Sequence, residues 1–327
     1  MKAMVLERQG SPLLLRDIPL PEPKDDEVLV EVEACGVCHT DLHIVEGELP
    51  AHRLPLVPGH QIVGRVVEVG RSVTSVAPGD LVGTPWLFSV CGECPFCRRG
   101  KENLCEKARF TGYDVDGGYA EYFLAYQDSV YPLPQGYELV ELAPLLCGGV
   151  IGYRAYRASG VGKGDILALF GFGSSAHLVL QMALFEGQEV FVFTRSPHHQ
   201  DLARKLGASF VGGAEDNPPL PFEAAIVFAP SGFLIRKALE YLAPGGKVVA
   251  AGIYATPIPE IPYELIYRER SIQTVANSTR QDVREFLALA GKHRFQVTTE
   301  VYSLEEANAV LEKLKRREIT ASAVLVP

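Results

Sequence analysis

Four cysteines within fifteen residues are the feature that most constrains the fold of this chain. They follow the pattern Cys91-x2-Cys94-x2-Cys97-x7-Cys105. Four thiolates complete a tetrahedral zinc shell and leave no position open for a reactant, so the spacing predicts a structural zinc in a compact loop. Gly92, Pro95 and Gly100 suit the tight turns of such a loop. Free or redox-active cysteines are the alternative, but a redox pair does not require four thiols in one loop.

The composition indicates two folded domains. The chain has 327 residues, of which 47% are hydrophobic and 22% charged. Its net charge of −9 disfavours nucleic acid and anionic membranes as partners, and no apolar run approaches the roughly 18–20 residues of a membrane span. Residues 1–7 lack the apolar core of a signal peptide and are expected to form a strand. A cytoplasmic location is therefore expected, where clustered cysteines bind metal rather than form disulfides.

The first part of the chain, up to about residue 147, is rich in short β-like runs separated by Gly and Pro. Residues 28–32 and 62–69 are examples. Short strands with frequent turn signals predict a β-rich, barrel-like unit.

After residue 150 the pattern changes to strands that alternate with helices. The expected strands are 166–170, 190–193, 225–228 and, after a turn at Pro244-Gly245-Gly246, 247–251, and the expected helices are 175–186 and 198–206. This alternation predicts a doubly wound parallel sheet, and hence an α/β protein. Two helical stretches and a strand at 323–326 complete the tail. We expect one domain from residues 1–148 plus 278–327, and a dinucleotide-binding domain from 149–277.

A glycine-rich loop joins the first strand of the second domain to its helix. Gly171 suits a tight turn, and Gly173 allows a close approach of the backbone to a pyrophosphate. Ala176 is small enough for helix–strand packing, and the helix that begins near Ser174 directs its N-terminus at the phosphates. The loop therefore predicts a nicotinamide dinucleotide.

The end of the next strand bears on which dinucleotide is bound. NAD enzymes place Asp or Glu there for the ribose 2′-hydroxyl, whereas this chain has Thr194, Arg195 and Ser196. A guanidinium and two hydroxyls suit a 2′-phosphate, so we expect NADP to be preferred over NAD. The alternative is a solvated arginine at a strand end.

Three further candidate metal ligands are spread along the chain: Cys38, His60 and Cys147. Two thiolates and a neutral imidazole around Zn²⁺ sum to zero charge and leave a fourth position open, as in a catalytic zinc site. Spacing alone does not join Cys147 to Cys38. A lone buried cysteine is often a small apolar residue, and Cys35 with Cys38 also forms a redox-like pair.

Four segments resemble motifs of the zinc-dependent medium-chain alcohol dehydrogenases, in the same order along the chain. They are 36–43 (GVCHTDLH), 58–64 (PGHQIVG), 91–105 and 145–149 (LLCGG). The resemblance implies a GroES-like catalytic domain and a Rossmann domain. It also implies a catalytic zinc held by Cys38, His60 and Cys147, and a structural zinc held by the four-cysteine loop.

The resemblance also implies how a proton leaves the reacting alcohol. Thr40 corresponds to the hydroxyl that starts the family's relay, which passes through a cofactor ribose to His43. Hydroxyls and imidazoles suit such transfers. A surface histidine without this role is the alternative for His43.

Further roles follow from the same resemblance. Asp41 corresponds to the carboxylate that orients His60. Trp86 and Leu49 fall where the family lines its substrate pocket, although an aromatic residue there is equally explicable as core. Gly252, Ile253 and Asn277 correspond to positions that flank the nicotinamide.

Two positions depart from the family pattern. Gln61 replaces the usual Glu after the ligand histidine, which we expect to weaken any assistance to ligand exchange at the metal. Ser322 stands where many relatives carry a pyrophosphate-binding arginine, and Arg280 is a candidate to compensate.

These features predict an enzyme that transfers hydride between a small apolar alcohol or aldehyde and NADP(H). The family also leads us to expect a homodimer or homotetramer. Two alternatives stay open: a zinc-free quinone reductase of the same superfamily, and a non-catalytic NADP-binding protein.

Overall fold

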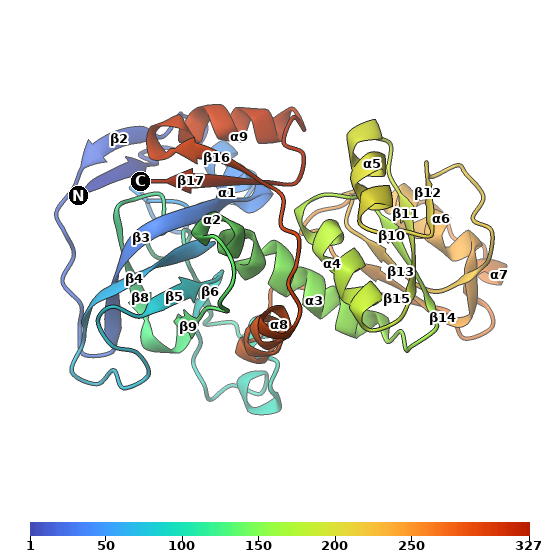
Figure 1. Cartoon of the computed structure of the whole chain (residues 1–327), viewed down its shortest axis with the longest axis horizontal. Helices are drawn as coiled ribbons and strands as arrows, with labels where there is room; N and C mark the ends of the chain where they lie inside the picture. Colours follow the sequence, from blue (N-terminus) through green and yellow to red (C-terminus); the bar gives the residue numbers. More distant parts are fainter. The chain divides into compact units, whose positions relative to one another are not determined.

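The computed structural model describes residues 1–327, which divide into two units (Figure 1). The first unit comprises Met1–Cys147 and Asn277–Pro327, and the second comprises Gly148–Ala276. None of the helices combines the length and the apolar character that a membrane span requires.

The first unit is built on a seven-stranded sheet with the order β16-β17-β3-β4-β5-β9, and β8 also pairs with β3. Its strands are β1 Lys2–Val5, β2 Leu14–Asp17, β3 Glu27–Val37, β4 Ile62–Val69, β5 Leu81–Thr84, β6 Leu87–Ser89, β7 Arg109–Phe110, β8 Tyr122–Tyr126, β9 Tyr131–Pro132, β16 Thr299–Ser303 and β17 Ser322–Val326. Its α-helices are α1 His39–Glu46, α2 Leu139–Leu142, α8 Arg280–Lys292 and α9 Ala307–Lys315. Short 3-10 helices are Cys97–Arg99, Glu102–Leu104, Gln127–Ser129, Ala143–Leu146 and Leu304–Glu306.

Strand β3 organises this unit because it pairs with β4, β8 and β17. The tail strand β17 runs antiparallel to the end of β3, with Val324 opposite Gly36, so the C-terminal strand belongs to the same sheet as β3 (Figure 1). Most β3 side chains are buried, and they contribute to the apolar core of the unit. The tail therefore folds with the N-terminal part.

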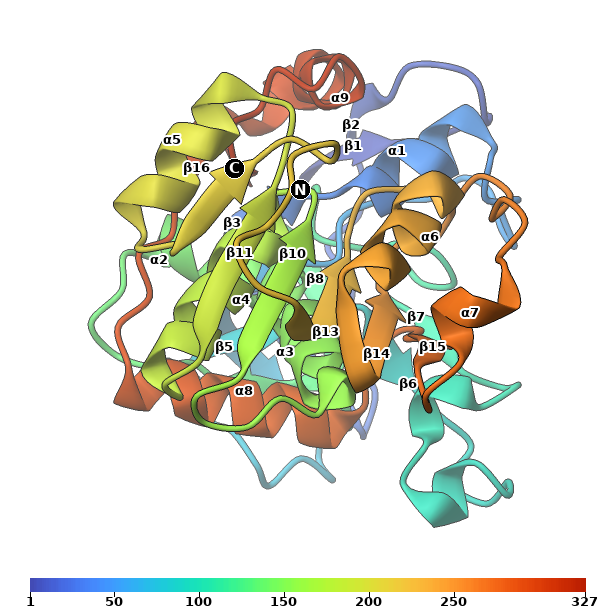
Figure 2. The same ribbon diagram turned by 90° about the vertical axis from the view of Figure 1, so that its right-hand side faces the viewer.

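The second unit is a six-stranded parallel sheet with the order β12-β11-β10-β13-β14-β15 (Figure 2). Its strands are β10 Ile166–Phe170, β11 Glu189–Phe193, β12 Phe210–Gly212, β13 Phe222–Val227, β14 Leu242–Ala250 and β15 Ser271–Thr274. Its helices are α3 Gly148–Ser159, α4 Ser174–Phe185, α5 Pro197–Lys205, α6 Gly232–Glu240 and α7 Tyr263–Ile266. The strand order reverses between β10 and β13, as in a doubly wound sheet. The predicted α/β class is confirmed.

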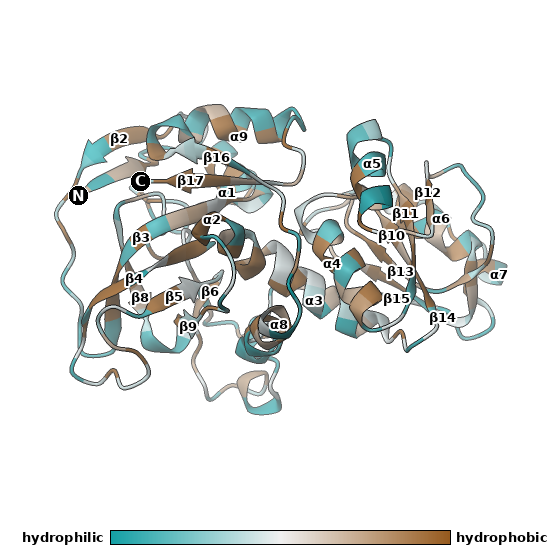
Figure 3. Cartoon of the chain, in the orientation of Figure 1, coloured by the Kyte–Doolittle hydropathy of each residue, from teal (hydrophilic) through white to brown (hydrophobic).

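The apolar run at residues 166–170 forms the central strand β10, all of whose side chains are buried. Strand β10 is hydrophobic along its length, and β13 is hydrophobic except at the exposed Glu223 (Figure 3). Phe170 stacks on Phe193 of the neighbouring strand with ring centroids 4.4 Å apart. A strand that is covered on both faces needs such a continuous apolar run.

The turn predicted at Pro244–Gly246 lies inside β14 as an irregularity of the ladder. Phe222 pairs with Leu242, but Ala224 pairs with Lys247, so β14 has extra residues there. Gly245 has φ +76, which glycine adopts without strain. The residues Pro244–Gly246 do interrupt the regular ladder, as a turn would. However, β14 pairs with β13 both before and after them, so the strand continues.

His177 in the first turn of α4 is a buried histidine that stays neutral. Its Nδ1 lies 3.3 Å from the carbonyl oxygen of Gly173, to which it donates in the neutral form. Burial lowers the pKa of His177 to about 4. Below the ordinary histidine pKa of about 6.5, the unfolded chain therefore takes up a proton that the folded chain excludes.

We expect the wild-type protein to lose about 2 kcal/mol more of its unfolding free energy between pH 7 and pH 5 than a His177→Gln variant does. The loss begins as the pH falls below about 6.5 and ends near pH 4, where the folded protein also binds the proton. Urea denaturation of both proteins at the two pH values measures this difference. Equal losses would show that His177 does not contribute.

Candidate functional site

Cys38, His60 and Cys147 lie far apart in the sequence but meet in the first unit. Cys38 directly precedes α1, His60 precedes β4, and Cys147 follows the 3-10 helix Ala143–Leu146. Their ligand atoms all lie within 4.8 Å of one another, and the two sulfurs are 3.9 Å apart. Two sulfurs and a nitrogen at these separations can surround one metal ion.

The imidazole of His60 is oriented by Asp41. His60 Nδ1 lies 2.9 Å from Asp41 Oδ1, and both side chains are buried. Because Nδ1 is engaged in this bond, Nε2 is the nitrogen available to a metal. Asp41 thus lies beside His60, the residue that it is predicted to orient.

The charges of this group favour a divalent cation. A hydrogen bond from the Cys147 thiol holds the pKa of Cys38 well below its usual range, and the bond to Cys38, with burial, raises the pKa of Cys147 well above it. Burial opposes protonation of His60, but the charge of Asp41 and the bond to it raise its pKa to about 10. Protons therefore compete with a metal for these three ligands, and two thiolates with a neutral imidazole would neutralise a doubly charged ion.

Gly59 allows His60 to take this position. Its φ is +99, and a Cβ there would lie 2.4 Å from Cδ1 of the Tyr119 ring. Any other residue would be strained and would collide with that ring.

Thr40 and His43 both lie on α1. Thr40 Oγ1 is 3.7 Å from Cys38 Sγ, so a hydroxyl stands beside the candidate metal position. His43 is partly exposed and its Nδ1 is hydrogen-bonded to the carboxylate of Glu48. Glu48 is not predictable from the sequence, because it lies beyond the helix end at Gly47, where helical spacing no longer predicts neighbours.

Trp86 lies next to His60, with ring centroids 4.9 Å apart in an edge-on arrangement. It stacks on Phe110 at 4.9 Å and on Tyr113 at 5.9 Å, two residues that the sequence analysis did not identify. Trp86 Nε1 donates to Asn277 Oδ1 at 3.2 Å. The three rings form an aromatic cluster in which Trp86 contacts His60.

The other predicted residues of this unit have neighbours of their own. Leu49 is partly buried against the apolar core. The amide of Asn277, predicted to flank the nicotinamide, donates to the Asn103 carbonyl at 3.2 Å in addition to accepting from Trp86. Gln61 is buried, and its side chain fills the space that a Cβ on Gly36 would need.

Arg280 and Ser322 are the two positions predicted to bear on the binding of a cofactor phosphate. The Arg280 guanidinium lies 3.4 Å from Asp128 Oδ2, and Ser322 is buried at the start of β17. The structure therefore provides a partner for Arg280 within the first unit.

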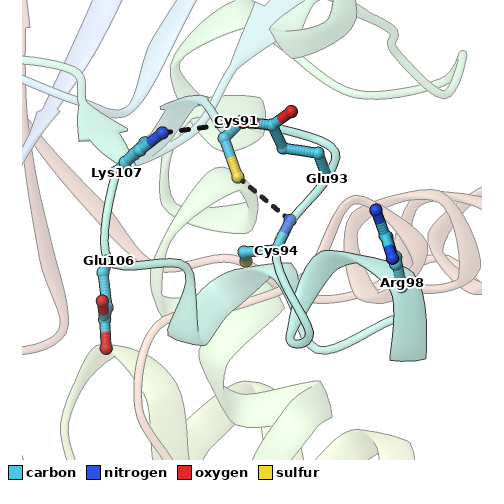
Figure 4. A pocket seen from close by; sticks show the side chains of 6 residues that line it. All are labelled: Cys91, Glu93, Cys94, Arg98, Glu106 and Lys107. Atoms are coloured by element: carbon cyan, nitrogen blue, oxygen red, sulfur yellow. Dashed lines mark hydrogen bonds and ion pairs between the residues drawn. The ribbon is translucent and has the colours of Figure 1, made fainter.

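The four-cysteine loop forms a second metal-type cluster. The sulfurs of Cys91, Cys94, Cys97 and Cys105 all lie within 4.8 Å of one another. The backbone N–H of Cys94 donates to Cys91 Sγ at 3.4 Å (Figure 4). Lys107 and Arg98 lie on this loop, as Figure 4 shows, and Lys107 Nζ lies 3.6 Å from Glu93 Oε1.

The dinucleotide loop has the expected geometry in the second unit. Gly171 has φ +88, and a Cβ on it would lie 3.0 Å from the backbone nitrogen of Ala229. Gly173 caps α4, and a Cβ there would meet nothing within 4 Å. Ala176 is fully buried in α4. Gly173, at the start of α4, therefore leaves room for a phosphate to approach the backbone.

Thr194, Arg195 and Ser196 follow β11 at the same edge of the sheet. Thr194 is held by a bond from its N–H to the Gly212 carbonyl at 2.8 Å, and Ser196 caps α5. Arg195 is exposed and forms no ion pair with the chain. Gly252 and Ile253 follow β14 and are exposed. Because the strands are parallel, all these segments lie at the carboxyl edge, where such sheets bind ligands.

Two family models match the chain. Residues 24–135 match the alcohol dehydrogenase GroES-like domain, and residues 176–292 match the zinc-binding dehydrogenase model. A Mycobacterium tuberculosis protein named "Probable alcohol dehydrogenase AdhA" is 47% identical over 313 residues, which are 94% of this chain and 90% of that protein.

Solved structures share the fold over the whole chain. Acetophenone reductase from Geotrichum candidum, in complex with NAD, has a TM-score of 0.90 and 28% identity, and the match covers 100% of this chain and 97% of that one. A protein assigned as a zinc-binding dehydrogenase from Sinorhizobium meliloti, bound to NADP, has a TM-score of 0.88 and 27% identity over 100% and 99% of the chains.

The thiols of the four-cysteine cluster differ in acidity, which gives a test of this loop. Hydrogen bonds from the backbone of Glu93 and Cys94 lower the pKa of Cys91 to about 6, whereas burial and the neighbouring thiols raise that of Cys97 to about 12. In chelated, zinc-free protein at pH 7, we expect iodoacetamide to modify Cys91 at least about 10-fold faster than Cys97, because the thiolate is the nucleophile. Modification of Cys91 should increase from pH 5 to pH 7 and then level off.

Peptide mass spectrometry measures the two rates. Zinc-loaded protein is the control and should resist modification at both sites. Equal rates at Cys91 and Cys97 in the zinc-free protein would contradict the described hydrogen bonding.

Proposed function

Because the chain belongs to the zinc-type medium-chain alcohol dehydrogenase family, we propose that it interconverts a small apolar alcohol and its aldehyde with NADP(H) at a catalytic zinc site. The chain is an NAD(P)-dependent oxidoreductase. The observation that carries the proposal is the convergence of Cys38, His60 and Cys147 within 4.8 Å. This donor set, neutral around Zn²⁺ and with a fourth position open, fits a catalytic ion.

The chain's own residues have distinct tasks in this proposal. Bound zinc supplies a Lewis acid that lowers the pKa of an alcohol hydroxyl, and the nicotinamide exchanges the hydride. Cys38, His60 and Cys147 hold the ion, and Asp41 keeps His60 in the tautomer that ligates through Nε2. The Thr40 hydroxyl lies beside Cys38, where it would accept the proton that the alcohol loses.

His43 and the aromatic residues complete the site. His43 passes the proton toward solvent, with Glu48 as its hydrogen-bond partner. Trp86 places an apolar ring beside His60, with Phe110 and Tyr113 stacked on it, and this aromatic cluster favours an apolar substrate. A panel of alcohols and aldehydes with both cofactors tests the substrate class.

The proposed pair of zinc sites can be tested by replacing one ligand. We expect about two zinc ions per wild-type chain, and about one in Cys38→Ser, with alcohol oxidation reduced at least about 100-fold. Cys35→Ser is the matched control, because Cys35 is a buried neighbour outside the ligand set, and it should retain both ions. Metal analysis and steady-state kinetics on the same samples measure both effects.

Other outcomes favour the alternatives. One zinc in the wild-type chain would favour a zinc-free type of reductase that keeps only the structural site. Two zinc ions without any alcohol or aldehyde turnover would favour a non-catalytic NADP-binding protein.

Arg195 supports NADP as the preferred cofactor. It is exposed and unpaired at the end of β11, flanked by Thr194 and Ser196, and no carboxylate stands there to accept a ribose hydroxyl. Of two solved structures with this fold, one contains NAD and the other NADP, so the fold by itself does not select the cofactor.

We expect Arg195→Asp to lower kcat/KM for NADPH by about 10- to 100-fold, because it replaces a charge-assisted bond to the 2′-phosphate with a repulsion. Its effect on kcat/KM for NADH should be smaller. Arg204→Asp, an exposed arginine on α5, is the control and should leave the preference unchanged. A wild-type preference for NADH would contradict the proposal.

Self-association and a reducing compartment are also part of the proposal. The second unit has an edge strand, β15, and exposed apolar residues at Ile253, Tyr254, Tyr263 and Tyr267. Such features support a homodimer or homotetramer. All seven cysteines are free thiols, and metal binding requires them reduced, as in the cytoplasm.

A further inference from the structure

Tyr119 lies close to the candidate catalytic site but belongs to none of the motifs discussed above. It lies shortly before β8, and its side chain is fully buried. Its hydroxyl donates to Asp41 Oδ2 at 3.1 Å. Tyr119 is thereby connected through one carboxylate to His60.

The Asp41 carboxylate depends on a small set of hydrogen bonds. Oδ2 accepts from the backbone N–H of Cys38 at 2.8 Å and from Tyr119, while Oδ1 lies 2.9 Å from His60 Nδ1. Asp41 has no Lys or Arg partner, and its ion pair is with His60. A fully buried carboxylate without a Lys or Arg partner is stabilised mainly by its hydrogen-bond donors. The Tyr119 hydroxyl is one of the few donors to Asp41 and therefore contributes substantially to its stabilisation.

The position of the Tyr119 hydroxyl is determined by the backbone that also carries His60. The Tyr119 N–H donates to the Pro58 carbonyl at 3.0 Å, and its carbonyl accepts from Met4 N at 2.8 Å. The ring packs against Gly59, where a Cβ would lie 2.4 Å from Cδ1. Tyr119 therefore has little freedom to move relative to the segment that presents His60.

We propose that the Tyr119 hydroxyl is a positioning group for the metal ligand His60 and acts through Asp41, an inference that rests on the proposed catalytic zinc. The bond to Oδ2 limits rotation of the carboxylate, so Oδ1 stays in line with His60 Nδ1. The same hydrogen bond stabilises part of the negative charge on Asp41, so the carboxylate polarises the imidazole of His60 less strongly. Both effects reach the metal through His60 Nε2.

The holoenzyme variant Tyr119→Phe tests this role by metal release. We expect a chelator to remove the catalytic zinc about 10-fold faster than from the wild type. Loss of a group that holds a metal ligand in position by hydrogen bonding weakens metal binding to about this extent. Zinc in the four-cysteine loop should be released at the wild-type rate. Tyr156→Phe is the matched control, because it loses a buried hydroxyl bonded to Gln188 at 2.9 Å, and both of its zinc ions should behave as in the wild type.

A double-mutant cycle shows whether the effect passes through Asp41. In an Asp41→Asn background, Tyr119→Phe should change the release rate of the catalytic zinc by less than about twofold. Independent, additive effects of the two substitutions would overturn the proposal. So would a wild-type release rate in Tyr119→Phe, or an equal acceleration at both zinc sites, which would indicate general destabilisation.

A spectroscopic measurement covers the case in which Tyr119→Phe does not fold. Replacing Tyr119 with 3,5-difluorotyrosine strengthens the donor with little change of shape. With Co²⁺ in the catalytic site, we expect its visible absorption bands to shift relative to the wild type, and unchanged bands would overturn the proposal. A wild-type chain with only one zinc would instead contradict the proposed function, so the two failures are distinguishable.

Discussion

The hydrogen bond between Asp41 and His60 is the interaction on which the candidate site depends. Both groups are buried, and the bond determines which imidazole nitrogen is available to a metal. The same carboxylate receives the N–H of Cys38, so one side chain positions two of the three candidate ligands. The third, Cys147, reaches them from the end of the 3-10 helix Ala143–Leu146.

The two units separate the chemical requirements of the proposed reaction. The first unit contains both groups of metal-type ligands, each held by loops and strand ends of an antiparallel framework. The second unit presents glycines and an unpaired arginine at the carboxyl edge of a parallel sheet. An edge of parallel strands suits phosphates because helix N-termini converge there, whereas a buried metal shell needs side chains from distant segments.

Sequence patterns predicted those features that depend on local chemistry. The apolar run 166–170 and the loop at Gly171 and Gly173 predicted β10 and the turn into α4, because a buried strand and a tight turn each require particular residues. Glu48, Phe110, Tyr113 and Tyr119 could not be predicted in the same way. Phe110, Tyr113 and Tyr119 contact site residues through the tertiary fold, and Glu48 contacts His43 across the end of α1, where no regular spacing applies.

By itself, the sequence determined the α/β class, the order of the strands along the chain and the compact four-cysteine loop, since period, turn residues and short-range ligand spacing act over a few residues. It identified Cys38, His60 and Cys147 only through resemblance to a family. Their meeting was decided by the tertiary structure, because β3, β4 and the segment before α3 bring together residues up to 109 positions apart. The same long-range packing placed the Tyr119 hydroxyl against Asp41. A buried carboxylate needs hydrogen-bond donors, and these can come only from the segments that pack around it.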